Sequence, residues 1–129
     1  MKESAFVKEH RAIRQKLLEE GKFKTDYSFY LWLAFRLTIM FSISLYLTLG
    51  CNGYWAHFAG AVGLGCFWQQ LAFIGHYLGH NGITHIQAVD NILGIFVGNF
   101  VGGISIGWWK RSHNVHHIVC NSVDHDPDI

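Results

Sequence analysis

The sequence contains an uncharged run that is too long for the surface of a small soluble domain. No Asp, Glu, Lys or Arg occurs from Leu37 to Val89, whereas eight of the ten Lys and Arg residues lie within positions 1–36. Soluble helical domains need charged and polar residues on their exposed faces, so such a run is typical of membrane-embedded segments. A formal net charge of +1 gives no indication of a nucleic-acid partner. We therefore expect an all-α, integral membrane helical protein.

A turn divides the uncharged run into two expected transmembrane helices. Gly50-Cys51-Asn52-Gly53 is a turn signal. Without it, the run would form a helix about 80 Å long, far longer than the hydrocarbon core of about 30 Å. We predict a first span over Phe29–Leu49 and a second from Trp55 to Ile74.

The basic N-terminal segment sets the expected orientation. Residues 3–20 place Phe6, Ile13 and Leu17 on one face and cations on the others, which predicts an amphipathic helix. This helix suits a membrane surface and an aqueous compartment equally well. By the positive-inside rule, residues 1–26 form a cytosolic segment, and everything after the second span returns to the cytosolic face.

A third apolar stretch, Asn91–Trp109, is ambiguous because its nineteen uncharged residues are enough to cross a membrane. A crossing would place His113, His116 and His117 on the far side, away from the other histidines. We therefore predict an interfacial or re-entrant helix before these histidines.

Five histidines form two groups with metal-ligand spacing. His76 and His80 are four residues apart, and His113, His116 and His117 form an HxxHH motif. Offsets of three and four residues share one face of a helix, so two helices could present five imidazoles to one or two metal ions. Neutral imidazole binds divalent transition metals, and histidines without cysteine ligands favour iron or zinc.

Other metal sites fit the sequence less well. Tyr77 stands where the HExxH motif of metalloproteases has its glutamate, and the three cysteines form no CxxC motif of the zinc deaminase type. Haem ligation inside a membrane bundle needs histidine pairs within the spans, and the expected spans contain only His57. His85 follows the first pair closely enough to approach a metal, whereas His10 and His57 fit structural or surface roles.

The two histidine groups and their flanking residues resemble the first two histidine boxes of membrane fatty-acid and sphingolipid desaturases. HxxxH follows a second span, and HxxHH comes about 33 residues later. The stretches that resemble front-end desaturases are FIGHYLGHNGITH (73–85), GWWKRSHNVHH (107–117) and HDPDI (125–129). The resemblance covers about residues 20–129 and is strongest to the fungal delta-8 sphingolipid desaturases.

The resemblance implies a multi-pass enzyme of the endoplasmic reticulum membrane, with its N-terminus and histidine boxes in the cytosol. It implies a non-haem di-iron centre that uses O2 and two electrons from cytochrome b5 to desaturate a ceramide or acyl lipid. By analogy, His76, His80, His113, His116 and His117 are iron ligands. Two spans with a short third element also leave a wide apolar surface, so we expect a partner such as a second desaturase subunit.

The sequence departs from the family pattern in three respects. It has neither the third box, QxxHH, nor the HPGG haem motif of a fused cytochrome b5 domain, and Tyr77 replaces the Asp that follows the first histidine. We therefore expect residues 27–129 to be a desaturase domain truncated before the third box. Two alternatives stay open: a lipid hydroxylase with the same metal chemistry, and a catalytically inactive membrane protein that binds lipid or a partner.

Overall fold

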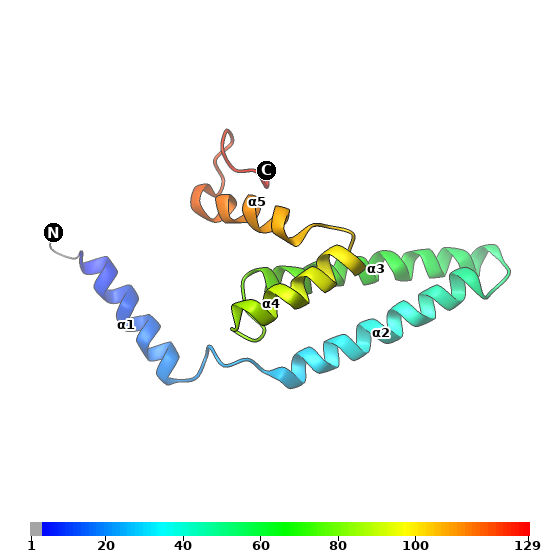
Figure 1. The fold of residues 1–129 in the computed structure, drawn as a ribbon, viewed down its shortest axis with the longest axis horizontal. Coiled ribbons are helices and arrows are strands. Elements are labelled where there is room, and N and C mark those ends of the chain that lie inside the picture. The colour runs from blue at the N-terminus through cyan, green and yellow to red at the C-terminus, as the bar shows by residue number, and fades with distance from the viewer. Residues whose placement is uncertain (1–3) are drawn as a thin grey trace.

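The described part of the chain, residues 4–129 of a computed structural model, consists of helices and contains no strand (Figure 1). The helices are α1 (Ala5–Glu19), α2 (Tyr27–Leu49), α3 (Tyr54–Gly79), α4 (Gln87–Gly94), the π-helix η1 (Ile95–Val101) and α5 (Ile106–Val119). The all-α prediction is confirmed.

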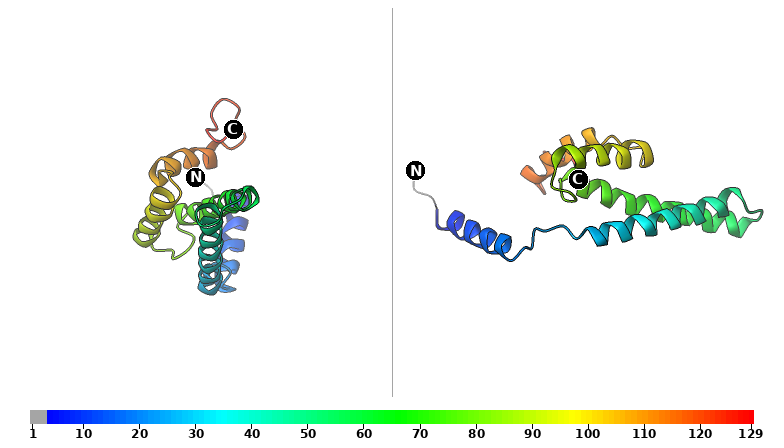
Figure 2. Two further views of the ribbon diagram at one scale, coloured as in Figure 1. Left: turned by 90° about the vertical axis from the view of Figure 1, so that its right-hand side faces the viewer. Right: turned by 60° about the horizontal axis from the view of Figure 1, so that its bottom comes forward.

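Helices α2 and α3 form a long antiparallel hairpin whose tight turn lies at the predicted position (Figures 1 and 2). Both are long and apolar enough to cross a membrane, which confirms the two predicted spans. α2 begins where the Asp26 carboxylate accepts the backbone N–H groups of Ser28 and Phe29. α3 continues past the predicted end at Ile74, so it carries its helical face on to the first histidine pair.

Close contact between α2 and α3 depends on small residues near the turn and on a core further along. Gly60 lies against α2, where an added Cβ would be 2.9 Å from the backbone oxygen of Ser44 and 2.9 Å from the backbone nitrogen of Thr48. The buried core between the two helices consists of Leu33, Leu37, Phe67 and Leu71. Small residues allow helix backbones to approach, as is usual for helix pairs in membranes.

The third apolar stretch is not one continuous helix. α4 and η1 run along α3, and the chain then turns sharply, so that α5 is bent by 110° from the α4–η1 segment. Gly103 turns the chain at φ +71°, and the Ser105 hydroxyl accepts the backbone N–H of Trp108 to start α5. The helix before the second histidine group therefore ends at Val101 and does not continue to Trp109. The bent pair is a broken span or a re-entrant segment, which includes the re-entrant geometry that the sequence predicts.

Helix α1 projects beyond the start of α2, and none of its residues is buried (Figure 1). It covers most of the predicted amphipathic helix, of which residue 3 lies outside the described part of the chain. Phe6 and Ile13 on its apolar face are 75% and 61% exposed, whereas Leu17 on the same face is half-buried.

Candidate metal centre

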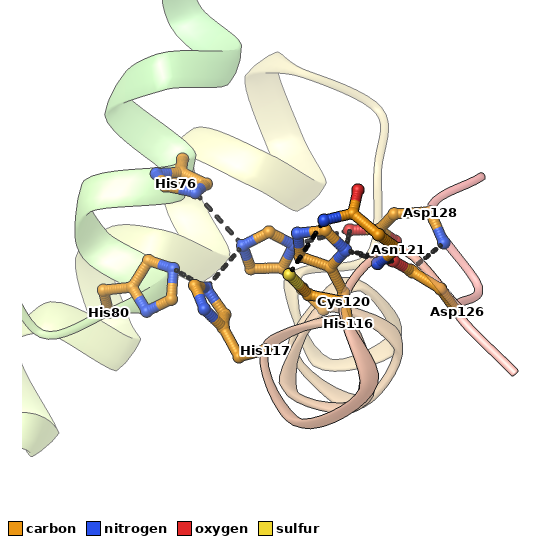
Figure 3. Close-up of polar contacts among 9 residues, drawn as sticks. His76, His80, His116, His117, Cys120, Asn121, Asp126 and Asp128 are labelled. Carbon is orange, nitrogen blue, oxygen red and sulfur yellow. Dashed lines mark hydrogen bonds and ion pairs between the residues drawn. The ribbon is translucent and has the colours of Figure 1, made fainter.

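The first histidine pair lies at the end of α3. His76 is on its last turn, and the backbone N–H of His80 donates to the carbonyl of His76, which extends the helical geometry to the second histidine. Residues four apart on a helix share a face, so both imidazoles point toward α5 (Figure 3).

Helix α5 brings two histidines of the HxxHH motif against this pair. The Nε2 atom of His113 lies 3.1 Å from Nε2 of His76 and 3.1 Å from Nε2 of His117. Nε2 of His117 lies 3.3 Å from Nε2 of His80. Four imidazoles from two helices, 37 residues apart in sequence for each cross-helix pair, therefore meet in one cluster (Figure 3).

The separation in each of these three contacts fits two nitrogen ligands of one metal ion. Imidazole nitrogens that bind one ion at about 2.0–2.1 Å are about 2.8–3.0 Å apart when adjacent in octahedral geometry and about 3.3–3.4 Å apart in tetrahedral geometry. One ligand atom from each of His76, His80 and His113 also falls within 4.8 Å of the others. A hydrogen bond between two imidazoles needs a proton on one nitrogen, whereas a cation would satisfy every facing lone pair at once.

His116 lies apart from this four-histidine cluster. Helical geometry places it about 100° around α5 from His117, so the two rings point in different directions. Nδ1 of His116 lies 2.9 Å from each carboxylate oxygen of Asp126. The structure thus brings four of the five predicted ligands together and holds the fifth beside them, with its ring centroid 5.2 Å from that of His113.

Carboxylates hold the outer nitrogens of two of these histidines. Nδ1 of His113 lies 2.7 Å from Oδ2 of Asp128 and donates its hydrogen to that oxygen. A histidine that donates from Nδ1 keeps the Nε2 lone pair free, and Nε2 is the atom that faces the cluster.

Burial favours the neutral form of His80 at the end of α3. It lowers the pKa of His80, and the neighbouring His76, His117, His113 and Lys110 lower this pKa further because each repels a second positive charge. A neutral imidazole has the lone pair that a metal ion requires.

Trp109 fixes the position of α5 against α3. Its ring stacks on that of His113 with centroids 4.4 Å apart, and it lies against Gly79, where an added Cβ would overlap the indole. The next residue of α5, Lys110, donates to the side-chain oxygen of Asn91 in α4 at 3.0 Å.

An apolar cavity of about 250 Å³ reaches the cluster. It lies between α3, η1 and α5, and His76 lines it beside Gly75, Gly98 and Trp109. The remaining walls are mostly aliphatic or aromatic, so the cavity suits a hydrocarbon segment rather than a polar ligand.

Two other residues of interest lie outside the cluster. His85 bonds through Nε2 to the Thr25 hydroxyl at 2.9 Å and through Nδ1 to the Asn81 carbonyl at 3.0 Å, so it ties the segment before α2 to the loop after α3. Tyr77, which replaces the usual Asp, packs against Tyr30 of α2 with ring centroids 6.0 Å apart.

Three residues of the site were not predicted from the sequence: Trp109, Asp126 and Asp128. Their only sequence signal was their place within stretches that resemble desaturases, because contacts made across a chain reversal leave no periodic pattern.

Comparison with known proteins agrees with the histidine pattern. A family model described as fatty acid desaturase matches residues 53–129. The chain is 47% identical over 121 residues to a delta 8-(E)-sphingolipid desaturase of Emericella nidulans, covering 93% of this chain and 21% of that protein. It is 42% identical over 123 residues to a protein of the same name from Lachancea kluyveri, covering 95% and 21%.

A plant relative extends the match. The chain is 34% identical over 126 residues to a delta(8)-fatty-acid desaturase of Helianthus annuus, covering 98% of this chain and 28% of that protein. No solved structure matches the chain. It spans about a fifth of the length of the fungal relatives. The matched family model covers more than half of the chain, including every histidine of the candidate centre, and the chain therefore belongs to the fatty acid desaturase family.

Proposed function

We propose that this chain supplies part of the iron centre of a membrane lipid desaturase. The proposed ligands are His76, His80, His113, His116 and His117. The observation that carries the proposal is the convergence of four Nε2 atoms from α3 and α5 at contacts of 3.1–3.3 Å. Membership of the desaturase family supports iron as the metal.

When bound, a non-haem di-iron pair supplies the O2 chemistry that removes two hydrogens from adjacent carbons of a hydrocarbon chain. The residues of this chain would hold the metal through neutral imidazoles. They would also exclude water from the site and place a hydrocarbon segment beside His76. The third histidine box of the family would add ligands from outside these 129 residues.

The apolar cavity and the relatives support a lipid substrate. A cavity of about 250 Å³ beside His76 has room for part of a hydrocarbon chain but not for a whole lipid. The fungal relatives are named as sphingolipid desaturases, so we propose the long-chain base of ceramide in preference to other acyl lipids.

The cellular setting follows from the same proposal. The two apolar helices indicate a membrane protein. We propose the endoplasmic reticulum membrane, with residues 1–26 and the histidine cluster on the cytosolic side, where cytochrome b5 would deliver electrons. The basic N-terminal segment supports this orientation.

Metal titration tests the proposal. The purified 129-residue chain in detergent should bind Co²⁺, a spectroscopic substitute for Fe²⁺, with a visible absorption band of nitrogen coordination. Losing a group that only hydrogen-bonds to a metal ligand usually weakens metal binding by about 10–100-fold. His117→Ala removes a proposed ligand itself, so it should weaken Co²⁺ binding by more than this.

His57→Ala is the matched control. His57 lies on the same helix as the first histidine pair, but its Nε2 bonds to the carbonyl of Cys51 at the opposite end. Its removal should leave Co²⁺ affinity unchanged. Equal affinities for the wild-type chain and His117→Ala would refute the four-histidine site.

A further inference from the structure

We propose that Asp126 and Asp128 are positioning residues that fix the tautomers and ring orientations of His116 and His113. This inference deepens the proposed function and rests on it, since it assigns these two carboxylates to the histidines of the metal centre. Both aspartates lie in the segment after α5, which folds back along the helix (Figure 3).

Asp128 orients one histidine of the four-histidine cluster, His113. Its Oδ2 atom is 2.7 Å from Nδ1 of His113 and 3.9 Å from Nδ1 of His116, so it pairs chiefly with His113. The His113 side chain is only 11% exposed, and its Nε2 atom is the one that touches two other histidines. The hydrogen donated to Asp128 therefore determines that the lone pair of His113 faces the cluster.

Asp126 pairs with His116, and its own orientation is fixed by backbone hydrogen bonds. Its side chain is 1% exposed, and its two oxygens accept the backbone N–H groups of Asn121 and Asp128, each at 2.9 Å. Both oxygens also lie 2.9 Å from Nδ1 of His116. A carboxylate fixed by two backbone donors can hold the imidazole in one orientation.

The two carboxylate–histidine pairs orient His113 and His116 in different directions. With Nδ1 committed to a carboxylate, each histidine presents Nε2 as its available lone pair. For His113 this atom points into the four-histidine cluster, whereas His116 is turned away around α5. A carboxylate on the outer nitrogen also raises the basicity of the inner one, which strengthens a metal bond.

The neighbouring Asp124 offers a matched comparison. It lies in the same segment, is exposed, and makes no hydrogen bond to a histidine among the described residues. A variant at this position changes the charge of the segment without touching the cluster. Asp128→Ala removes the acceptor from His113, and Asp128→Asn restores an acceptor oxygen without the charge.

The experiment measures two quantities on the full 129-residue chain in detergent. Nitrogen-15 NMR of the metal-free protein reports the tautomer of each histidine, and Co²⁺ titration reports affinity. In the wild type, His113 and His116 should carry their proton on Nδ1. Asp128→Ala should abolish this preference at His113 and lower Co²⁺ affinity by about 10–100-fold. Asp128→Asn should recover part of both effects, and Asp124→Ala should change neither.

The outcomes separate this inference from the proposed function. Wild-type tautomers in Asp128→Ala would overturn the positioning role, whatever the metal affinity. Suppose that the wild-type chain binds no Co²⁺, but that Asp128→Ala still loses the Nδ1-protonated tautomer of His113. This result would support the positioning role and refute the metal centre. Asp126→Asn tests His116 in the same way. Because Asp126 also holds backbone groups, Asp128→Ala is the decisive variant.

Discussion

The indole of Trp109 lies where a side chain on Gly79 would be, and the same ring stacks on His113 at a centroid distance of 4.4 Å. One contact between α3 and α5 therefore sets how far apart the two histidine groups lie. Gly79 lies between His76 and His80 on the last turn of α3, and the contact with Trp109 requires a glycine there, whereas the helix itself does not.

Replacing this glycine should separate the two groups. In Gly79→Ala the new methyl group would force the Trp109 ring outward and move His113 with it. We expect weaker Co²⁺ binding and a loss of about 1–3 kcal/mol of stability, the usual cost of overpacking. Gly65→Ala is the control, because a Cβ on Gly65 in the same helix meets nothing within 4 Å. Unchanged affinity in Gly79→Ala would show that α5 does not depend on this contact.

Filling the apolar cavity should separate lipid binding from metal binding. Gly75 lines the cavity, and an added Cβ there meets nothing within 4 Å, so Gly75→Leu can enter the cavity without displacing backbone. We expect less binding of a spin-labelled ceramide, with Co²⁺ affinity close to that of the wild type. Gly65→Leu, on an exposed face of α3, should leave both properties unchanged. Undiminished ceramide binding in Gly75→Leu would place the hydrocarbon segment elsewhere.

The hairpin should be sensitive to any side chain at Gly60. An added Cβ would lie 2.9 Å from the Ser44 carbonyl oxygen and 2.9 Å from the Thr48 nitrogen, and backbone atoms cannot rotate away. Gly60→Ala should lower the free energy of unfolding in mixed micelles by about 1–3 kcal/mol. Gly65→Ala should instead raise it by up to about 1 kcal/mol through helix propensity. Equal stabilities would mean that α2 and α3 pack less closely at this point.

Acid should loosen the start of α2. Hydrogen bonds from the Ser28 hydroxyl and from the backbone N–H of Phe29 lower the pKa of Asp26, against a smaller opposing effect of burial. A lowered carboxyl pKa means that the cap stabilises the helix above the ordinary aspartate pKa. This contribution is lost as the pH falls through the lowered value. Amide hydrogen exchange at Ser28 and Phe29 should therefore show weaker protection at low pH.

Asp26→Asn supplies the control for this pH dependence. Asparagine is as good an N-cap as aspartate but does not titrate in this range. Protection at Ser28 and Phe29 should then be independent of pH. If the wild type and Asp26→Asn lost protection in parallel, the acid effect would arise from another group.

Much of the fold could be predicted from local sequence. The uncharged run determines two apolar helices, because charged groups are costly in hydrocarbon, and Gly50 to Gly53 determine where the chain reverses. Helical periodicity alone places His76 beside His80 and His113 beside His117. These properties depend on residues a few positions apart, so the sequence carries them directly.

The third apolar stretch shows where this reasoning ends. Composition gave Asn91–Trp109 the appearance of one helix, but the chain turns between Val101 and Ile106, and α5 starts inside the predicted segment. The π-helix before the turn and the indole N–H of Trp68, which donates to the Val101 carbonyl at 3.1 Å, are tertiary features without a periodic signal.

Sequence alone thus determined the class of protein, the two long helices and the five candidate ligands. Tertiary structure decided which imidazoles meet, that His116 is turned toward Asp126, and that Asp128 holds His113. The physical reason is range: a helical face is set by neighbours three or four residues away. The meeting of α3 with α5 depends instead on a bend of 110° and on one tryptophan seated against one glycine.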